Sequence, residues 1–151
     1  MIFCAVFCTT KNNGIRNKMV ERTFALIKPD AVKAKNIGKI IDMIEQNGFE
    51  IVKMHKIHMS EDQAKAFYAV HKEKPFFQEM IDFVISGPVI AMMLEKENAI
   101  TDWRDLMGAL KDPKEGTIRK SFGTDIMLNA VHGSDAPETA KTELALFFPC
   151  C

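Results

Sequence analysis

Short apolar runs alternate with segments of helical spacing along this chain, and this alternation restricts its fold more than any other feature. Residues 23–27 and 88–94 are largely apolar stretches of strand length, as expected for buried strands. Residues 49–59 alternate between apolar and polar side chains, which is typical of a half-buried strand. Together with the short segment 129–132, these patterns predict a sheet with helices between its strands.

The segments between these strands have the spacing and the end signals of helices. Asn36 is placed to cap a helix whose isoleucines share one face, and Ser60 to cap the next helix ahead of an acidic first turn. Pro75 opens a further short helix, so a helical hairpin is expected. The other predicted elements are a helix over residues 97–107, a long surface loop over residues 108–120, and a final helix to Phe147 or Phe148, capped jointly by Asp135 and Glu138.

In chain order these elements predict β-α-β-β-α-β, the ferredoxin-like arrangement of the α/β (α+β) class, with an antiparallel sheet covered by helices. A length of 151 residues suits a single domain. The polar, glycine-containing stretch that ends at Lys18 predicts a disordered N-terminal extension over residues 1–18, and Met19 is a candidate start. The folded domain is therefore expected to span residues 19–151.

The balance of charge limits the classes of partner. Lys plus Arg number 20 and Asp plus Glu number 20, so the chain lacks the overall positive field that sequence-independent nucleic-acid binding needs. An anionic ligand would have to be held by a local cluster of cations. The apolar run 2–8 is far shorter than a membrane span, so no membrane partner is expected.

The cysteines lie only at the two ends of the chain, at positions 4, 8, 150 and 151. This distribution does not suit a set of structural disulfides. It is typical of incidental thiols in a reducing cytosol, and it therefore predicts a cytoplasmic protein. A metal site made by these thiols would require the two ends to meet, so no metal ligands are predicted.

His132 is the strongest candidate for chemistry. It ends an apolar segment, precedes a glycine that permits close approach, and stands just before a helix start. A nucleophile that meets a phosphate group suits this position, although core and capping histidines occur at such positions too. Lys28 at a strand end, with Arg104 and Arg119 flanking the long loop, could form a polyphosphate clamp. The alternative for each cation is a solvated surface charge.

Two further observations bear on nucleotide binding. Phe76 and Phe77 form an aromatic pair that could stack on a base, and the alternative is core packing. The sequence contains neither the G-x-x-x-x-G-K-[ST] loop nor the glycine loop of protein kinases. A nucleotide with its Mg²⁺ would therefore have to be held in a different way.

Residues 129–135 read Asn-Ala-Val-His-Gly-Ser-Asp, and this stretch resembles the active-site signature of the nucleoside diphosphate kinases. Several ordered motifs agree by chance far less often than one, and the resemblance covers roughly residues 20–148. The chain is therefore identified as a member of this family. The other stretches that resemble the family's landmarks, in its order, are residues 21–30, 74–77, 86–88 and 116–119.

The resemblance implies a ping-pong transfer of phosphate. His132 would take the γ-phosphate of a nucleoside triphosphate, typically ATP, and pass it to a nucleoside diphosphate through a phosphohistidine. By position, Glu143 is similar to the carboxylate that orients this histidine, and Ser134 to the hydroxyl that helps to hold it. Lys28 completes the implied catalytic set. Mg²⁺ would be bound mainly through the phosphates of the nucleotide.

The resemblance also implies a nucleotide site with a pair of side chains that sandwich the base. A flat stacking surface accepts every base, so this pair implies broad specificity. His71 either faces the phosphates or has a structural role. The residues carried over by position are Lys28, Arg104 and Arg119 for the phosphates, Tyr68 and Asn129 for hydrogen bonds near the phosphates and ribose, and Phe76 and Ile126 for the base.

The sequence departs from the family pattern in two places. Leu110 stands where the family usually has a phosphate-contacting threonine, and the loop from there to Arg119 is shorter. This change leaves open an alternative function, a non-catalytic or impaired nucleotide-binding or regulatory module of the same fold. The chain also stops soon after its last helix, whereas many relatives have a tail that packs on a neighbouring subunit. The expected homo-oligomer is therefore either a hexamer or a tetramer.

Overall fold

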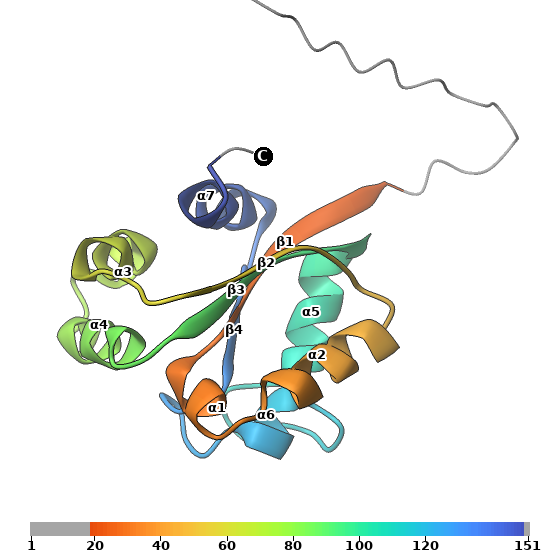
Figure 1. Cartoon of the computed structure of the whole chain (residues 1–151), viewed down its shortest axis with the longest axis horizontal. Helices are drawn as coiled ribbons and strands as arrows, with labels where there is room; N and C mark the ends of the chain where they lie inside the picture. The colour runs from red at the N-terminus through yellow and green to blue at the C-terminus, as the bar shows by residue number, and fades with distance from the viewer. Residues whose placement is uncertain (1–18, 150–151) are drawn as a thin grey trace, which may run out of the picture.

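The computed structural model describes residues 19–149, and a four-stranded sheet runs through its centre (Figure 1). The strand order is β2-β3-β1-β4 and every neighbouring pair is antiparallel. This order confirms the predicted ferredoxin-like arrangement. The strands are β1 (Val20–Ile27), β2 (Glu50–Ile57), β3 (Val89–Glu97) and β4 (Val131–Gly133).

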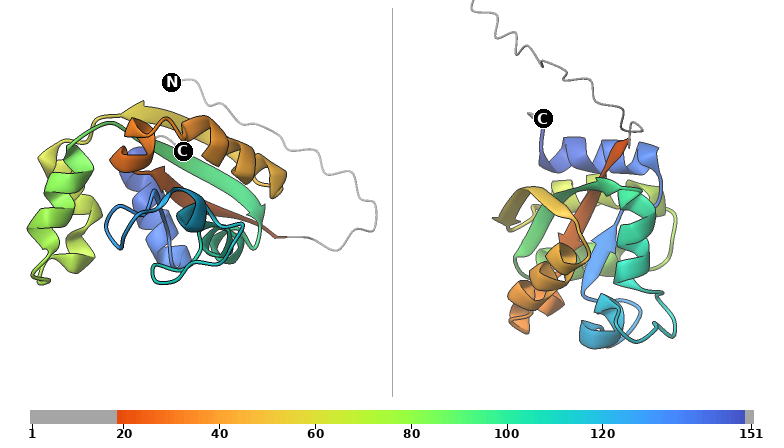
Figure 2. Two further views of the ribbon diagram at one scale, coloured as in Figure 1. Left: turned by 90° about the horizontal axis from the view of Figure 1, so that it is seen from below. Right: turned by 90° about the vertical axis from the view of Figure 1, so that its right-hand side faces the viewer.

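Helices cover both faces of the sheet (Figures 1 and 2). One face packs against α1, α2, α5 and α6, and the other against α3, α4 and α7. The connection between β2 and β3 contains the predicted helical hairpin. The helices are α1 (Pro29–Lys33), α2 (Ile37–Gln46), α3 (Glu61–Phe67), the 3-10 turn η1 (Ala69–His71), α4 (Phe77–Ile85), α5 (Ala99–Met107), α6 (Ile118–Phe122) and α7 (Pro137–Phe147).

The inner strand β1 divides its side chains between the two cores. Ala25 and Ile27 belong to the core shared with α2 and α5, while Phe24 and Leu26 belong to the core shared with α3, α4 and α7. All four side chains are completely buried. Because successive side chains in a strand point to opposite faces, burial on both faces produces the continuous apolar run seen in the sequence.

Two predicted helix starts differ in outcome. Ser60 Oγ accepts the Gln63 N–H and Gln63 Oε1 accepts the Ser60 N–H, both at 3.2 Å, which confirms the predicted cap of α3. Asn36 precedes α2 as predicted, but its side chain makes no capping bond, so that detail of the prediction is wrong. The completely buried Ile40 and Ile44 attach α2 to the sheet instead.

The helix predicted from residue 97 begins later, at Ala99. Glu97 ends β3, and Asn98 adopts a left-handed conformation with a φ of 58°, which turns the chain from strand into helix. The Ile100 N–H donates to the Glu21 carboxylate at 2.9 Å. Glu21, which is distant in the sequence, thus provides an acceptor for an N–H in the first turn of α5.

The surface loop predicted over residues 108–120 is shorter than expected, because its end folds into α6. Ile118 is completely buried in the core that α2 and α5 share, and this contact anchors the helix. α6 has only five residues, and Ile118 and Phe122, its two apolar side chains against this core, make a single helical interval. That is too little for the sequence pattern to reveal the helix.

The predicted capping box of the final helix is also wrong. α7 begins at Pro137 after Ala136, which offers no side-chain cap. Asp135 instead accepts a hydrogen bond from Thr139 Oγ1 at 2.5 Å, and this bond is the main cause that lowers the pKa of the Asp135 carboxyl. Proline suits the first helical position because it has no N–H that needs a partner there.

Among residues 19–149, no helix is long and apolar enough to cross a membrane, and no group of three or more His, Cys, Asp or Glu side chains is placed to hold a metal ion. The four cysteines and the predicted N-terminal extension lie outside the described residues.

Candidate active site

β4 places His132 beside the inner strand β1. Its backbone pairs with Leu26, and its side chain is 26% exposed. The ring packs edge-on against Phe67, with 4.7 Å between the ring centroids, and Phe24 and Tyr68 also stand beside it. Aromatic neighbours therefore hold the imidazole while part of it stays open to solvent.

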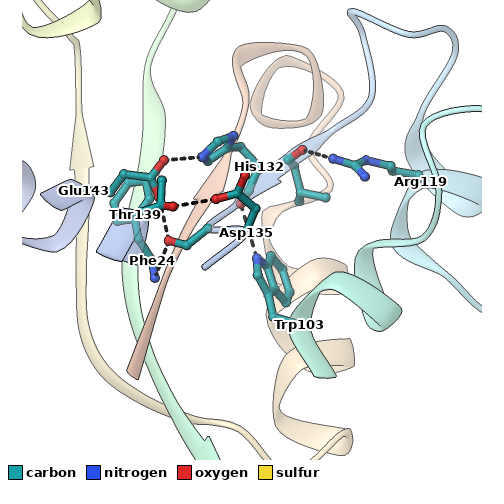
Figure 3. Close-up of polar contacts among 9 residues, drawn as sticks. Phe24, Trp103, Arg119, His132, Asp135, Thr139 and Glu143 are labelled. Atoms are coloured by element: carbon teal, nitrogen blue, oxygen red, sulfur yellow. Dashed lines mark hydrogen bonds and ion pairs between the residues drawn. The ribbon is translucent and has the colours of Figure 1, made fainter. Parts of the chain in front are cut away.

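A carboxylate on α7 fixes the orientation of this ring (Figure 3). Glu143 is 7% exposed, and its Oε1 lies 2.9 Å from His132 Nε2. The Ser134 hydroxyl donates to the other carboxylate oxygen, Oε2, at 2.5 Å. Because an ionised carboxylate can only accept hydrogen bonds, Nε2 carries the proton of the neutral ring. The contact therefore leaves Nδ1 with a free electron pair.

The backbone of His132 is held from the other face of the sheet. Trp103 on α5 is completely buried, and its Nε1–H donates to the His132 carbonyl at 3.3 Å (Figure 3). The indole can approach this closely only because residue 133 is glycine, since a β-carbon there would overlap the indole nitrogen. Thus α7 fixes the side chain of His132 and α5 fixes its carbonyl.

We expect Gly133→Ala to destabilise the fold by about 1–3 kcal/mol, because the added methyl group must displace the buried Trp103 ring. Urea unfolding followed by fluorescence measures this change, and Trp103 is the only tryptophan in the chain. Gly38→Ala is the matched control, since a β-carbon at Gly38 meets nothing within 4 Å. Equal stability of the two variants would contradict the close approach of the indole.

Lys28 directly follows β1, and its ammonium group is poorly solvated. Nζ donates to the Met127 carbonyl at 3.5 Å and lies 6.0 Å from the centroid of the Phe83 ring. Burial, and then the positive charge of Arg119, lower the pKa of Lys28 to about 8. Lys28 and Arg119 therefore lie close enough for their charges to interact, and a polyphosphate would be attracted to this region.

Arg119 on α6 and Arg104 on α5 are the other predicted cations. Arg119 donates through Nη1 to the Gly108 carbonyl at 2.7 Å and through Nη2 to the Val131 carbonyl at 3.2 Å. Burial, and then the charge of Arg104, lower the pKa of Arg119 to about 10, so the guanidinium remains charged at neutral pH. Arg119 therefore joins the base of the altered loop to β4.

A hollow of about 600 Å³ opens beside Arg119. The buried Asn129 lines it, and Asn129 Oδ1 has no hydrogen-bond partner among the described residues. Leu110 and Ile126 also line it and are 51% and 58% exposed. The lining residues are Leu110, Lys111, Asp112, Pro113, Arg119, Lys120, Gly123, Thr124, Asp125, Ile126 and Asn129.

The other predicted residues form a row of rings that starts at His132. The centroid distances from His132 to Tyr68, from Tyr68 to His71, and from His71 to Phe76 are each 6.4 Å. Burial, and then the charge of Glu143, raise the pKa of Tyr68, so its hydroxyl stays protonated. Phe76 ends the row, 42% exposed, and it is not part of the lining of the hollow that contains Ile126.

Phe67 and Trp103 are neighbours of His132 that the sequence pattern does not reveal. Each contacts His132 across a long interval of sequence, Phe67 through its ring and Trp103 through its indole N–H. Trp103 had one usable signal, because it is the only tryptophan and stands next to Arg104. Phe67 has no such signal, since an apolar residue at the end of a helix is ordinary.

Comparisons of sequence with known proteins lead to one family. The profile described as "Nucleoside diphosphate kinase" matches residues 21–151. Nucleoside diphosphate kinases of Pelobacter propionicus and Helicobacter pylori are 56% and 53% identical to the chain, over 85% and 86% of its length and 96% of theirs.

Solved structures agree with the sequences. The nucleoside diphosphate kinase of Aquifex aeolicus superposes with a TM-score of 0.84 at 41% identity, covering 86% of this chain and 96% of that one. A halophilic nucleoside diphosphate kinase from Halobacterium salinarum, in complex with CDP, gives a TM-score of 0.83 at 40% identity and covers 86% and 88%. The chain therefore belongs to the nucleoside diphosphate kinase family, a family of phosphotransferases that act on nucleotides.

Proposed function

We propose that this chain transfers the γ-phosphate of a nucleoside triphosphate to a nucleoside diphosphate, with His132 Nδ1 as the nucleophile. The observation that carries the proposal is the 2.9 Å contact between His132 Nε2 and Glu143 Oε1. A carboxylate partner at Nε2 favours the tautomer with the proton on Nε2 and the electron pair on Nδ1, and the ring is partly open to solvent.

In the first half-reaction, Nδ1 attacks the γ-phosphorus while the bond from phosphorus to the β,γ-bridging oxygen breaks. The nucleoside diphosphate leaves with the electron pair of that bond. His132 then carries the phosphate on Nδ1 and a proton on Nε2, so the ring is a cation whose charge lies against the Glu143 carboxylate. In the second half-reaction, a terminal oxygen of another diphosphate attacks the same phosphorus, and Nδ1 departs with its electron pair.

Mg²⁺ enters this proposal as a companion of the nucleotide. The side chains available to bind the phosphates are the cations Lys28, Arg104 and Arg119. The described residues contain no cluster of metal ligands. This set of side chains fits an ion that the phosphate oxygens themselves hold. When bound, such an ion neutralises part of the phosphate charge, while the chain's own cations hold and orient the phosphates.

Phe76 and Ile126 are proposed to hold the base between them. Both are apolar and substantially exposed, so each can lose water-accessible surface against a flat ring. Stacking on a flat ring is indifferent to the identity of the base, which supports broad specificity. Leu110 adds a half-exposed apolar side chain to the same hollow as Ile126.

We further propose that the chain forms a homo-oligomer. β2 lies at one edge of the sheet, and Met54 on this strand is 48% exposed. An edge strand offers unpaired backbone groups, and an exposed apolar side chain on it favours contact with a second copy. Sedimentation velocity measures the assembly, and a monomer at micromolar concentration would contradict the proposal.

The loop around Leu110 favours one alternative, a regulatory module that binds nucleotides without turnover. Incubation with ATP labelled at the γ-phosphate separates the two functions. The proposed enzyme acquires an acid-labile label on histidine and passes it to an added nucleoside diphosphate. A chain that binds ATP but acquires no label would be the regulatory module.

The pKa of Lys28 predicts how activity depends on pH. Because burial lowers this pKa to about 8, the ammonium group is charged below that pH and loses its charge above it. We therefore expect kcat/KM, which reports the free enzyme, to fall as the pH rises above about 8, by up to about tenfold per unit. In kcat the fall should occur at higher pH, because bound phosphate favours the charged form.

Lys28→Arg is the control for this pH profile, since a guanidinium keeps its charge throughout this range. Its kcat/KM is expected to be lower overall but to lack the fall near pH 8. A profile of the unaltered chain that stays flat to pH 9.5 would exclude the titration of Lys28, and a fall that persists in Lys28→Arg would assign it to another group.

A further inference from the structure

We propose that Asp30 is a positioning residue for His132, because its carboxylate holds the strained turn from which β4 begins. The inference rests on the proposed function of His132. Asp30 acts through the backbone of Ala130, two residues before the imidazole.

The turn before β4 contains a rare backbone conformation. Ala130 has a φ of 70° and is completely buried, and the Val131 N–H donates to the Asn129 carbonyl at 2.9 Å. A hydrogen bond between residues two apart defines a γ-turn, and its positive-φ form is strained for any residue with a β-carbon. Such a conformation persists only where the surrounding contacts hold it.

Two contacts from one short segment hold Ala130. Its N–H donates to Asp30 Oδ2 at 3.0 Å, and its carbonyl accepts the Lys28 N–H at 2.8 Å. Lys28 and Asp30 flank Pro29, the first residue of α1, whose ring restricts the backbone between them. Both backbone polar groups of the strained residue are thus satisfied by the segment that carries the Lys28 ammonium group.

This turn sets the positions of two site residues together. Asn129 lies immediately before Ala130, and its side-chain amide donates to the Ile126 carbonyl at 2.6 Å, while His132 follows in β4. Without the Asp30 carboxylate, the Ala130 N–H would be buried with no acceptor and the strain would be unopposed. The turn would then relax, and His132 would shift relative to the phosphates that it must attack in line.

The same carboxylate acts on Lys28 through space. Burial and the charge of Arg119 lower the pKa of Lys28, whereas the charges of Asp30 and Asp125 raise it, Asp30 more strongly. Removal of the Asp30 charge alone is therefore expected to lower this pKa further. The loss of phosphate binding would then begin at a lower pH.

A double-mutant cycle of Asp30→Ala and Ala130→Gly tests the positioning role. Asp30→Ala is expected to lower kcat about ten- to a hundredfold, because the turn loses the acceptor that holds it. Glycine adopts a positive φ without strain, so Ala130→Gly alone should leave kcat within about twofold. The same change should restore most of the loss in the double variant, a coupling that a merely structural role of Asp30 in α1 would not produce.

Asp30→Asn is the matched variant, since its side chain keeps an acceptor oxygen and loses the charge. It is expected to keep kcat near that of the unaltered chain at pH 7, while the alkaline fall of kcat/KM moves to lower pH. An unmoved alkaline fall would refute the action on Lys28. A loss in Asp30→Ala that Ala130→Gly does not reduce would refute the positioning role, and Asp30→Asn keeps the inference testable if Asp30→Ala does not fold.

Hydrogen exchange of the Ala130 amide without nucleotide separates this inference from the proposed function. Asp30→Ala is expected to speed that exchange at least about tenfold, because the N–H loses its acceptor. If exchange is faster in Asp30→Ala but the unaltered chain never becomes phosphorylated, the proposed function is refuted. The inference that Asp30 stabilises the turn at Ala130 would still stand. Unchanged exchange in an active enzyme would refute the role of Asp30.

Discussion

His132→Ala is expected to abolish labelling by γ-labelled ATP and to lower phosphate exchange between nucleotides by at least about four orders of magnitude. The physical reason is that Nδ1 supplies the electron pair that bonds to phosphorus, and the methyl group of alanine has none. Quenched-flow labelling measures the first effect, and a coupled exchange assay measures the second.

The fold and nucleotide affinity of this variant should be largely unchanged. The backbone of residue 132 keeps its pairing with Leu26, and Lys28, Arg104 and Arg119, the cations proposed to bind the phosphates, are unchanged. His55→Ala is the matched control, since it removes an exposed imidazole from the edge strand β2. Rapid exchange that survives in His132→Ala, or a comparable loss in His55→Ala, would contradict the assignment of the nucleophile.

The fold could be predicted where burial produces a recognisable pattern of apolar residues within a short stretch of sequence. β1 is covered on both faces, so its apolar run identified it, and the Ser60 cap of α3 depends only on residues three apart. α6 was not predicted, because a five-residue helix with two apolar side chains, Ile118 and Phe122, is too short to show a pattern. The predicted cap of α7 failed because Asp135 bonds to the Thr139 side chain.

Candidate site residues could be proposed from the sequence where one residue type at one position is sufficient, as for His132, Lys28, Arg104 and Arg119. The residues that support them could not, because they depend on contacts between distant segments. Trp103 reaches the His132 carbonyl from α5, and Asp30 reaches the Ala130 N–H across an interval of 100 residues. The positive φ of Ala130 was equally hidden, since alanine gives no sign of a left-handed backbone.

Glu143 is expected to contribute the second-largest effect, since it acts on His132 in two ways. It accepts the Nε2 proton of the resting ring, and it faces the positive charge that the ring gains when Nδ1 is phosphorylated. A hydrogen bond to a charged group contributes about 1.5–3 kcal/mol, so Glu143→Ala should lower kcat by about ten- to a hundredfold. The value of KM should change little, because Glu143 contacts the histidine and not the nucleotide.

Two neighbouring variants separate the proton acceptor from the charge. Glu143→Gln keeps an oxygen that can accept from Nε2 but loses the charge, whereas Ser134→Ala removes only the 2.5 Å bond to Oε2. The loss in kcat is therefore expected to decrease in the order Glu143→Ala, Glu143→Gln, Ser134→Ala.

Nitrogen-15 spectra of the resting His132 ring report the tautomer without any nucleotide. They should show protonated Nε2 in the unaltered chain and a mixture of tautomers in Glu143→Ala. If Glu143→Ala kept the same tautomer but lost the expected activity, stabilisation of the charged phosphohistidine would account for the whole effect of Glu143. If the tautomer changed while kcat did not, the 2.9 Å contact would orient the ring without limiting the reaction.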